Sequence, residues 1–104
     1  MTTPPGSTRL SHSAALILKA VSLGYSFGLD VMEATGLPSG TVYPALRRLE
    51  RDQLVESKWE SEQEATSSNR PARRYYDVTS AGKAAALAVT ERYPLLARFV
   101  LERR

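Results

Sequence analysis

The spacing of the apolar residues changes at Leu54, and this change constrains the fold more than any other feature of the sequence. Before Leu54, apolar residues recur at the three- and four-residue spacing of amphipathic helices. After it, Val55, Ser57 and Trp59 alternate with charged residues, which predicts a strand with one buried and one hydrated side. Because the chain has 104 residues, we expect helices and strands to share one core.

Three short helices are predicted before that change, at residues 11–23, about 28–35 and about 40–53. Ser11 or Ser13 can accept a hydrogen bond from the free N–H groups of the first helix, and Ser39 is the expected N-cap residue of the third. Gly36 ends the second helix, since glycine tolerates the left-handed conformation that is common after a helix. Residues 1–10 are rich in proline and hydroxyl side chains, so we expect a flexible tail there.

A two-stranded hairpin and an alanine-rich helix follow the change in spacing. The first strand follows Leu54, the second covers residues 73–79, and a polar loop is expected at 62–72. Trp59 occupies an inward position of the first strand, so we expect it in the core rather than against a ligand. The last helix runs toward the end of the chain, and Pro94 is expected to kink or break it.

The order of these elements, three helices and then a hairpin, is that of a winged helix-turn-helix. The expected fold is therefore mainly α with a small β-hairpin. The expected regions are a flexible N-terminal tail at residues 1–10, a winged helix-turn-helix domain at 11–79 and a C-terminal dimerisation helix at 80–104, kinked near Pro94. In such a domain the third helix enters the major groove of DNA, and the hairpin, called the wing, reaches the backbone or the minor groove.

Composition and motifs argue against several other classes of protein. With no cysteine and a single histidine, His12, the sequence predicts neither a disulfide framework nor a metal site. It contains no glycine-rich phosphate loop and none of the nucleophile or zinc motifs of hydrolases, so we expect no catalysis and no cofactor. The apolar stretch at residues 14–23 is shorter than the ~20 residues of a membrane span, and no secretory signal precedes it. These features predict a cytoplasmic protein without a membrane partner.

Charge is sorted into blocks along the chain. The net charge of +3 and the pI near 9.5 suit a polyanionic partner. Residues 39–51 carry a net charge of +2, residues 52–64 carry −4 and residues 65–76 carry +3. Two basic blocks around an acidic one are typical of a domain that presents one face to an anion. Double-stranded DNA is the predicted partner; the alternative is a winged-helix protein-interaction module that binds an acidic protein instead.

The third predicted helix carries a proline on its outward face. Pro44 removes a backbone N–H and crowds the Gly40 carbonyl, a defect that costs up to ~3 kcal/mol inside a regular helix. Both residues lie opposite the apolar face, where water can reach that carbonyl and the small Gly40 relieves the crowding. The pair is expected to form a low, narrow ridge that lets the start of the helix approach a duplex closely.

Polar and basic side chains surround this ridge. Hydroxyl groups at the start of the helix can bind phosphate beside the positive end of the helix dipole. Arg47 and Arg51 lie one turn apart and can reach base edges, whereas Arg48 lies nearer the DNA backbone. The alternative is three solvated arginines, one of them paired with Glu50 or Asp52. The predicted DNA contacts are Ser39, Gly40, Thr41, Tyr43, Pro44, Arg47, Arg48, Arg51 and, on the wing, Arg70, Arg73 and Arg74.

Two strings of the sequence are distinctive: SGTVYPALRRLERDQLVES at residues 39–57 and RPARRYYDVTSAG at residues 70–82. Together they resemble the PadR family of bacterial transcriptional regulators, whose motif reads approximately S-P-G-T-L-Y-P-A-L-R-R-L-E-x-x-G-L-V and then R-R-Y-Y-x-L-T-x-x-G. The resemblance covers about residues 11–92 and is to the type with a short C-terminal region. It implies a homodimeric winged-helix repressor that binds a palindromic operator.

The resemblance also implies how the dimer forms. The C-terminal helix of one subunit packs on the N-terminal helix of the other, and an effector near that interface alters the spacing of the two DNA-reading heads. The interface is predicted to contain Leu16, Ala20, Leu23, Val89, Leu96, Phe99 and Val100, of which the first three form a second apolar face of the first helix. Tyr93 and Phe99 are candidates for lining a site for a small hydrophobic effector, although aromatic residues at helical spacing more often serve packing.

Two residues depart from the family pattern. Leu29 stands where family members carry the tyrosine of a G-Y-E-[IL] string at the start of the second helix. Gln53 stands where they carry the glycine that precedes the first strand.

Overall fold

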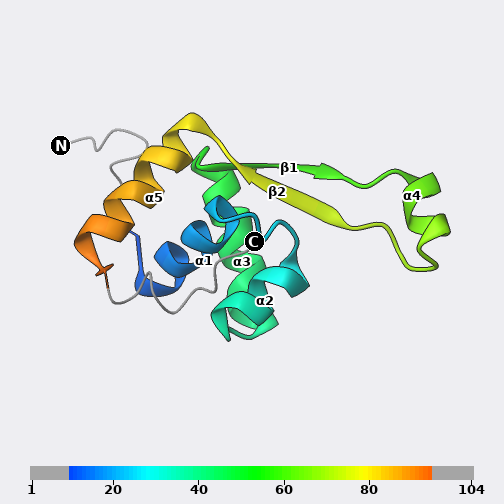
Figure 1. Cartoon of the computed structure of the whole chain (residues 1–104), viewed down its shortest axis with the longest axis horizontal. Helices are drawn as coiled ribbons and strands as arrows, with labels where there is room; N and C mark the ends of the chain where they lie inside the picture. Colours follow the sequence, from blue (N-terminus) through cyan, green and yellow to red (C-terminus); the bar gives the residue numbers. More distant parts are fainter. Residues whose placement is uncertain (1–9, 95–104) are drawn as a thin grey trace.

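The structure, a computed structural model, describes residues 10–94. The elements in this part of the chain are α1 (His12–Ser22), α2 (Gly28–Thr35), α3 (Ser39–Arg51), β1 (Val55–Trp59), α4 (Glu62–Ser67), β2 (Arg74–Val78) and α5 (Ser80–Arg92). Figure 1 shows α1, α2, α3 and α5 gathered into one body, from which the hairpin of β1 and β2 projects with α4 at its far end. This is the predicted fold class, mainly helical with a small antiparallel hairpin. None of the described helices combines the length and apolarity needed to cross a membrane.

α1 is the central helix of the core. It packs against α2, α3 and α5, and its side chains Ile17 and Leu18 are completely buried. The Ser11 hydroxyl accepts a hydrogen bond from the Ala14 N–H and caps the helix, as predicted. A cap and a buried apolar stripe together explain why this segment is helical.

The prediction that α1 has a second face open to another subunit is wrong for the described chain. Leu16 and Ala20 are buried in the chain's own core, and Leu23 is partly buried against it. Val89 of α5, assigned to the same interface, is buried too. The reason is that α2, α3 and α5 together enclose α1.

α3 begins one residue earlier than predicted, at Ser39, and Pro38 is its N-cap residue. No side chain caps the helix; the Pro38 carbonyl accepts a hydrogen bond from the Thr41 N–H at 2.9 Å. The expected N-cap role of Ser39 is therefore wrong, because Pro38 already holds the extended conformation that this position requires. The helix ends at Arg51, and Gln53 takes a left-handed φ of 62° in the turn into β1.

β1 and β2 pair antiparallel, with Val55 opposite Val78 and Trp59 opposite Arg74. On the inward face, Val55 and Tyr76 are buried as predicted. Trp59 lies on the same face but is 63% exposed, so its prediction as a core residue is wrong. Alternation identified the correct face of the strand, but the hairpin extends past the helical body, and the described chain provides nothing to cover its outer end (Figure 1).

A short helix, α4, forms inside the polar loop that was expected at residues 62–72. The Ser61 hydroxyl accepts a hydrogen bond from the Glu64 N–H, and the carboxylates of Glu62 and Glu64 lie in the first turn, where they complement the helix dipole. Ala65 is buried. The loop prediction is wrong because it overlooked a capping-box pattern, a serine followed three residues later by a glutamate.

α5 packs on α1 and begins at a cap in which the Thr79 hydroxyl accepts a hydrogen bond from the Gly82 N–H. A Cβ at Gly82 would collide with the Leu54 carbonyl oxygen, so only glycine lets α5 approach the start of the hairpin this closely. The helix ends at Arg92, two residues before Pro94, in line with the predicted break. The remaining predicted interface residues, Leu96, Phe99 and Val100, lie outside the described residues.

Candidate nucleic-acid interface

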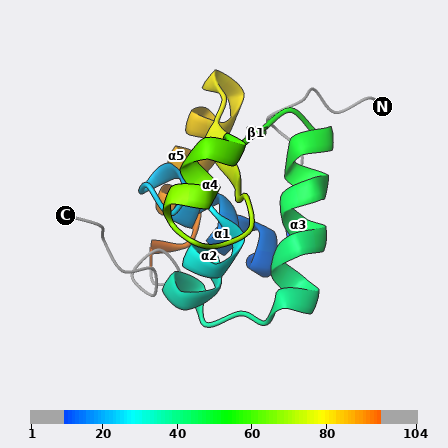
Figure 2. The ribbon, with the colours of Figure 1, turned by 90° about the vertical axis from the view of Figure 1, so that its right-hand side faces the viewer.

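The outward face of α3 is exposed. Val42 and Leu46 face the core, whereas Gly40 and Pro44 are exposed on the opposite side. A Cβ at Gly40 would meet no atom within 4 Å. Figure 2 shows α3 at one edge of the body, with its outer side turned away from the other described elements. The Gly40–Pro44 ridge therefore lies at the surface, where the sequence predicted it.

The start of α3 places hydroxyl groups beside α2. Ser39 is exposed and Thr41 is partly buried. The Tyr43 ring packs directly on Gly28, the first residue of α2. The contact is so close that a Cβ at Gly28 would collide with the ring. Tyr43 still leaves 38% of its surface exposed. Its ring is thus fixed by packing while part of it remains available to a ligand.

The three arginines of α3 are exposed. Within residues 10–94, Arg47 and Arg48 form no ion pair. Arg51 places its Nε 3.6 Å from Oδ1 of Asp52, but 73% of the Arg51 side chain is exposed, and a pair of this kind contributes little free energy. The positive charge of this face is therefore available to an anionic ligand.

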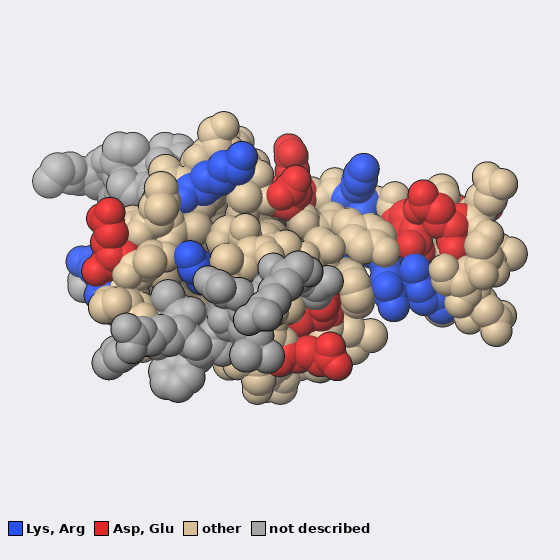
Figure 3. All heavy atoms as spheres, in the orientation of Figure 1, with Lys and Arg blue, Asp and Glu red and all other residues tan. Residues whose placement is uncertain are grey.

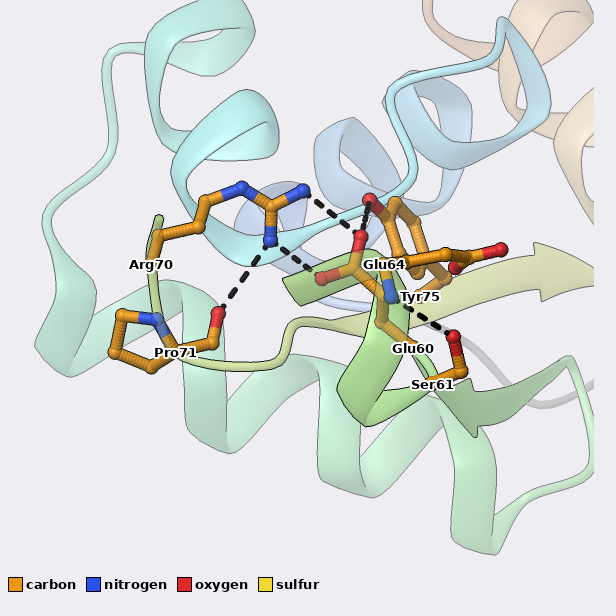
Figure 4. A network of polar contacts seen from close by, with 6 residues as sticks. All are labelled: Glu60, Ser61, Glu64, Arg70, Pro71 and Tyr75. Atoms are coloured by element: carbon orange, nitrogen blue, oxygen red, sulfur yellow. Dashed lines mark hydrogen bonds and ion pairs between the residues drawn. The ribbon is translucent and has the colours of Figure 1, made fainter. Parts of the chain in front are cut away.

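The end of the wing is held by one carboxylate, that of Glu60 (Figure 4). Arg70 donates two hydrogen bonds to it, at 2.5 and 2.8 Å, and the Tyr75 hydroxyl donates a third at 3.0 Å. The Glu60 side chain is only 5% exposed. The hydrogen bond from Arg70 lowers the pKa of Glu60 to about 2 against the opposing effect of burial, and Tyr75 lowers it further. Figure 3 shows acidic and basic side chains crowded together at this end of the hairpin.

The base of the wing is tied to α3 by a second carboxylate. Arg74 donates hydrogen bonds to Glu50 at 3.1 Å and to the Ser57 hydroxyl at 2.9 Å, and Ser57 donates to Glu50 at 2.5 Å. Arg73 places its guanidinium 4.1 Å from the centre of the Phe27 ring, within cation–π distance. All three arginines predicted on the wing thus have partners inside the protein.

A groove of about 520 Å³ lies between α3 and the wing. Its walls include Tyr43 and Arg47 from α3, the first residues of α2, and Trp59 with the three wing arginines from the hairpin. The predicted contacts Tyr43, Arg47, Arg70, Arg73 and Arg74 therefore meet around one concave surface. Arg48 and Arg51 do not line it and face outward elsewhere on α3.

A helical body with an exposed third helix and a projecting hairpin defines the winged-helix class of proteins. Within that class, the chain belongs to the PadR-like family of transcriptional regulators, whose pattern matches residues 17–88. The family resemblance predicted from the two sequence strings is confirmed, and with it a role in DNA-binding regulation.

Solved structures of similar proteins share the fold. A PadR family transcription regulator from Clostridium difficile is 22% identical, with a TM-score of 0.70 over 85% of this chain and 93% of the other. A PadR-like transcription factor from Bacteroides fragilis is 24% identical, with a TM-score of 0.63 over 82% of each chain. A Streptococcus mutans protein is also 24% identical, with a TM-score of 0.66 over 91% of this chain and 85% of the other. A search of curated protein sequences finds no match.

Sequence reasoning missed the carboxylates that hold the wing arginines. From the sequence, Glu50 is only a possible partner of an arginine on the third helix, and Glu60 lies among the charged residues on the hydrated side of the first strand. Glu60 lies on the strand face opposite Trp59, where Tyr75 also lies, but its contact with Arg70 depends on how α4 folds the end of the hairpin. The capping pattern at Ser61 was the one signal in the sequence for that geometry.

Proposed function

We propose that the chain is a repressor that acts as a homodimer and binds a palindromic operator, with α3 in the major groove. The observation that carries the proposal is the pair of exposed guanidinium groups, Arg47 and Arg48, beside the bare Gly40–Pro44 ridge. A guanidinium without an internal carboxylate retains its donors for phosphate or for a guanine edge. The ridge supports close approach of the helix to the duplex.

Each predicted contact has a role in this proposal. Hydroxyl groups at the start of α3 position the helix on phosphate, where its free N–H groups also point. Arg47 and Arg51 read base edges, and Arg48 binds the DNA backbone. The wing arginines steady the hairpin against the duplex with less free charge, because their guanidinium groups already have partners. The positioning set is Ser39, Thr41 and Tyr43, and the wing set is Arg70, Arg73 and Arg74.

The proposed dimer uses α5 and the residues that follow it. Leu87 on α5 is 65% exposed, and in this proposal the partner subunit covers it. Leu96, Phe99 and Val100 belong to the same proposed interface. A small hydrophobic effector bound between the subunits would release the operator by changing the spacing of the two α3 helices.

Selection from random duplexes tests the proposal. The expected product is a palindrome whose half-sites lie about 34–36 Å apart, bound with an affinity that falls steeply between about 50 and 200 mM salt. Arg47→Ala should relax the preference at one base position, whereas Arg92→Ala, which removes an exposed arginine from α5, should not. Failure to enrich any duplex at low salt, or salt-sensitive binding to an acidic protein without affinity for a duplex, would contradict the proposal.

A further inference from the structure

Three of the four large apolar side chains that are exposed in the described chain surround one groove. Leu29, Tyr43 and Trp59 are 60%, 38% and 63% exposed, and all three line the groove between α3 and the wing. The fourth, Leu87, lies on α5. Apolar side chains that are exposed singly are common on protein surfaces, whereas exposed apolar side chains grouped in one place indicate a binding surface.

The Trp59 indole is exposed, but its position is fixed by its neighbours in the hairpin. Trp59 lies opposite Arg74 in the hairpin, and the Arg74 guanidinium is 5.6 Å from the centre of the indole ring. Arg74 is itself held by Glu50 of α3 and by Ser57 of β1. The indole therefore stands on a part of the wing that is braced against α3, and it faces the same groove as Arg47.

The charges of the groove indicate what fills it. Arg47, which forms no ion pair within the described chain, lines it together with the apolar groups, so its occupant must combine negative charge with exposed carbon atoms. A DNA duplex offers both, since phosphates alternate with deoxyribose carbons along each strand and thymine methyl groups project into the major groove. A duplex bound to Arg47 would lie across the mouth of the groove.

We propose that Trp59 and Leu29 are apolar DNA contacts. A duplex seated on α3 would pack the edge of one strand into the groove, with the indole against deoxyribose carbons or a thymine methyl group beside the base pairs that Arg47 reaches. This inference rests on the proposed function and adds to it a contact that arginine positions do not predict.

The tryptophan itself provides the test, because Trp59 is the only tryptophan in the chain. Purified protein is titrated with a selected operator duplex that carries a dye, and dye anisotropy is recorded together with tryptophan emission and acrylamide quenching. We expect the emission to shift to shorter wavelength and the quenching to fall as the anisotropy saturates. Saturated anisotropy with unchanged emission and quenching would overturn the inference alone, whereas anisotropy that never rises would overturn the proposed function with it.

Two controls accompany this measurement. In the double variant Trp59→Phe with Lys58→Trp, the tryptophan moves to the opposite face of β1, and its emission should not respond to the duplex. A dilution series of the wild-type protein without DNA provides the second control. Emission that shifts with protein concentration would mean that a second copy of the chain covers Trp59, which would overturn the inference.

Trp59→Ala gives an independent result from affinity. We expect about tenfold weaker operator binding, which corresponds to ~1.4 kcal/mol, with an unchanged slope of log affinity against log salt, because the lost group is uncharged. Trp59→Phe should recover most of the affinity. Because the side chain is exposed, thermal unfolding should be unchanged and should confirm that each variant folds. Equal affinities for the wild-type protein and Trp59→Ala would contradict the inference.

Discussion

The two basic regions of the molecule, α3 and the wing, hold their arginines in different states. On α3, Arg47 and Arg48 are exposed and form no ion pair within the described chain. On the wing, Arg70 is bound by Glu60 and Arg74 by Glu50. Equal numbers of positive charges in the sequence therefore correspond to unequal capacities to bind an anion.

The charge of an arginine alone therefore does not show whether its guanidinium is available to bind a ligand. A carboxylate that accepts two hydrogen bonds from an arginine cancels most of its field and occupies its donors. In this protein the acidic block between the two basic ones supplies that carboxylate at the end of the wing. We infer that α3 supplies most of the electrostatic attraction and the wing mainly supplies shape.

The largest effect that tests this comparison is on the salt dependence of DNA binding. Arg48→Ala removes an unpaired charge that we place on the DNA backbone, so the slope of log affinity against log salt should fall in magnitude by about 0.9. Operator affinity at low salt should fall about tenfold, within the range of a charge-assisted hydrogen bond. Removing Arg70 and the charge of Glu60 together should change the slope by less than half as much, because the two groups already neutralise each other.

A double variant separates charge from folding in this experiment. Arg70→Ala with Glu60→Gln removes both partners of the ion pair, so the net charge of the chain stays as in the wild type. It should show nearly the wild-type slope. Equal changes in slope for Arg48→Ala and for the double variant would show that Arg70 contributes as much charge to DNA binding as Arg48, which would contradict the difference between the wing and α3.

Local sequence signals predicted most of the fold because they act over a few residues. The cap at Ser11, the left-handed residue Gly36 and the break before Pro94 each depend on backbone chemistry within one turn of a helix. Alternation likewise predicted which face Trp59 occupies. It did not predict that Trp59 is exposed, because burial depends on how far the hairpin extends past the helices.

The sequence likewise predicted those parts of the candidate site that depend on local structure. The ridge and the exposed arginines follow from the helical period of α3, since residues four apart share a face. The partners of the wing arginines do not, because Glu60 and Arg70 are brought together by the short helix that folds the end of the hairpin. The assignment of Leu16 and Ala20 to the dimer interface is wrong for a related reason. A second apolar face on a helix indicates that something packs on it, but only the tertiary packing shows that the same chain provides the contact.

The junction between α3 and the wing gives a second, smaller effect. Gln53 has a φ of 62°, a conformation that costs a residue with a Cβ roughly 1–2 kcal/mol and costs glycine little. Gln53→Gly should therefore raise the free energy of unfolding by about 0.5–1 kcal/mol, after the greater entropy of glycine in the unfolded chain is deducted. Chemical denaturation measures this change.

The matched control at the junction is Gln53→Ala, which keeps the Cβ and should give no stabilisation. Neither variant alters a charge in α3 or the wing, so operator affinity should stay at the wild-type value. A stabilised Gln53→Gly that binds the operator differently would show that the angle between α3 and the wing, and not their charges alone, sets affinity. Equal stability of the two variants would contradict the strain at this position.

The smallest effect is local and concerns the Glu60 carboxylate at the end of the wing. Its pKa is about 2 in the folded protein, below the ordinary value of 4.5, because Arg70 donates hydrogen bonds to it. Above pH 4.5 the carboxylate is ionised in both the folded and the unfolded chain, and its stabilising contribution is fully present. As the pH falls from 4.5 to about 2, the unfolded chain binds a proton that the folded chain does not, so the contribution declines.

Carbon-13 NMR of the carboxyl group measures this titration directly. We expect the Glu60 signal to titrate near pH 2, and in Arg70→Ala its midpoint should move upward toward 4.5. At neutral pH, Glu60→Gln should speed hydrogen exchange at the α4 amides while leaving global unfolding nearly unchanged, because the pair holds only the end of the hairpin. A wild-type midpoint near 4.5 would mean that Arg70 is not held by Glu60 in solution. The wing would then carry a free arginine like those of α3, and the contrast between the two regions would disappear.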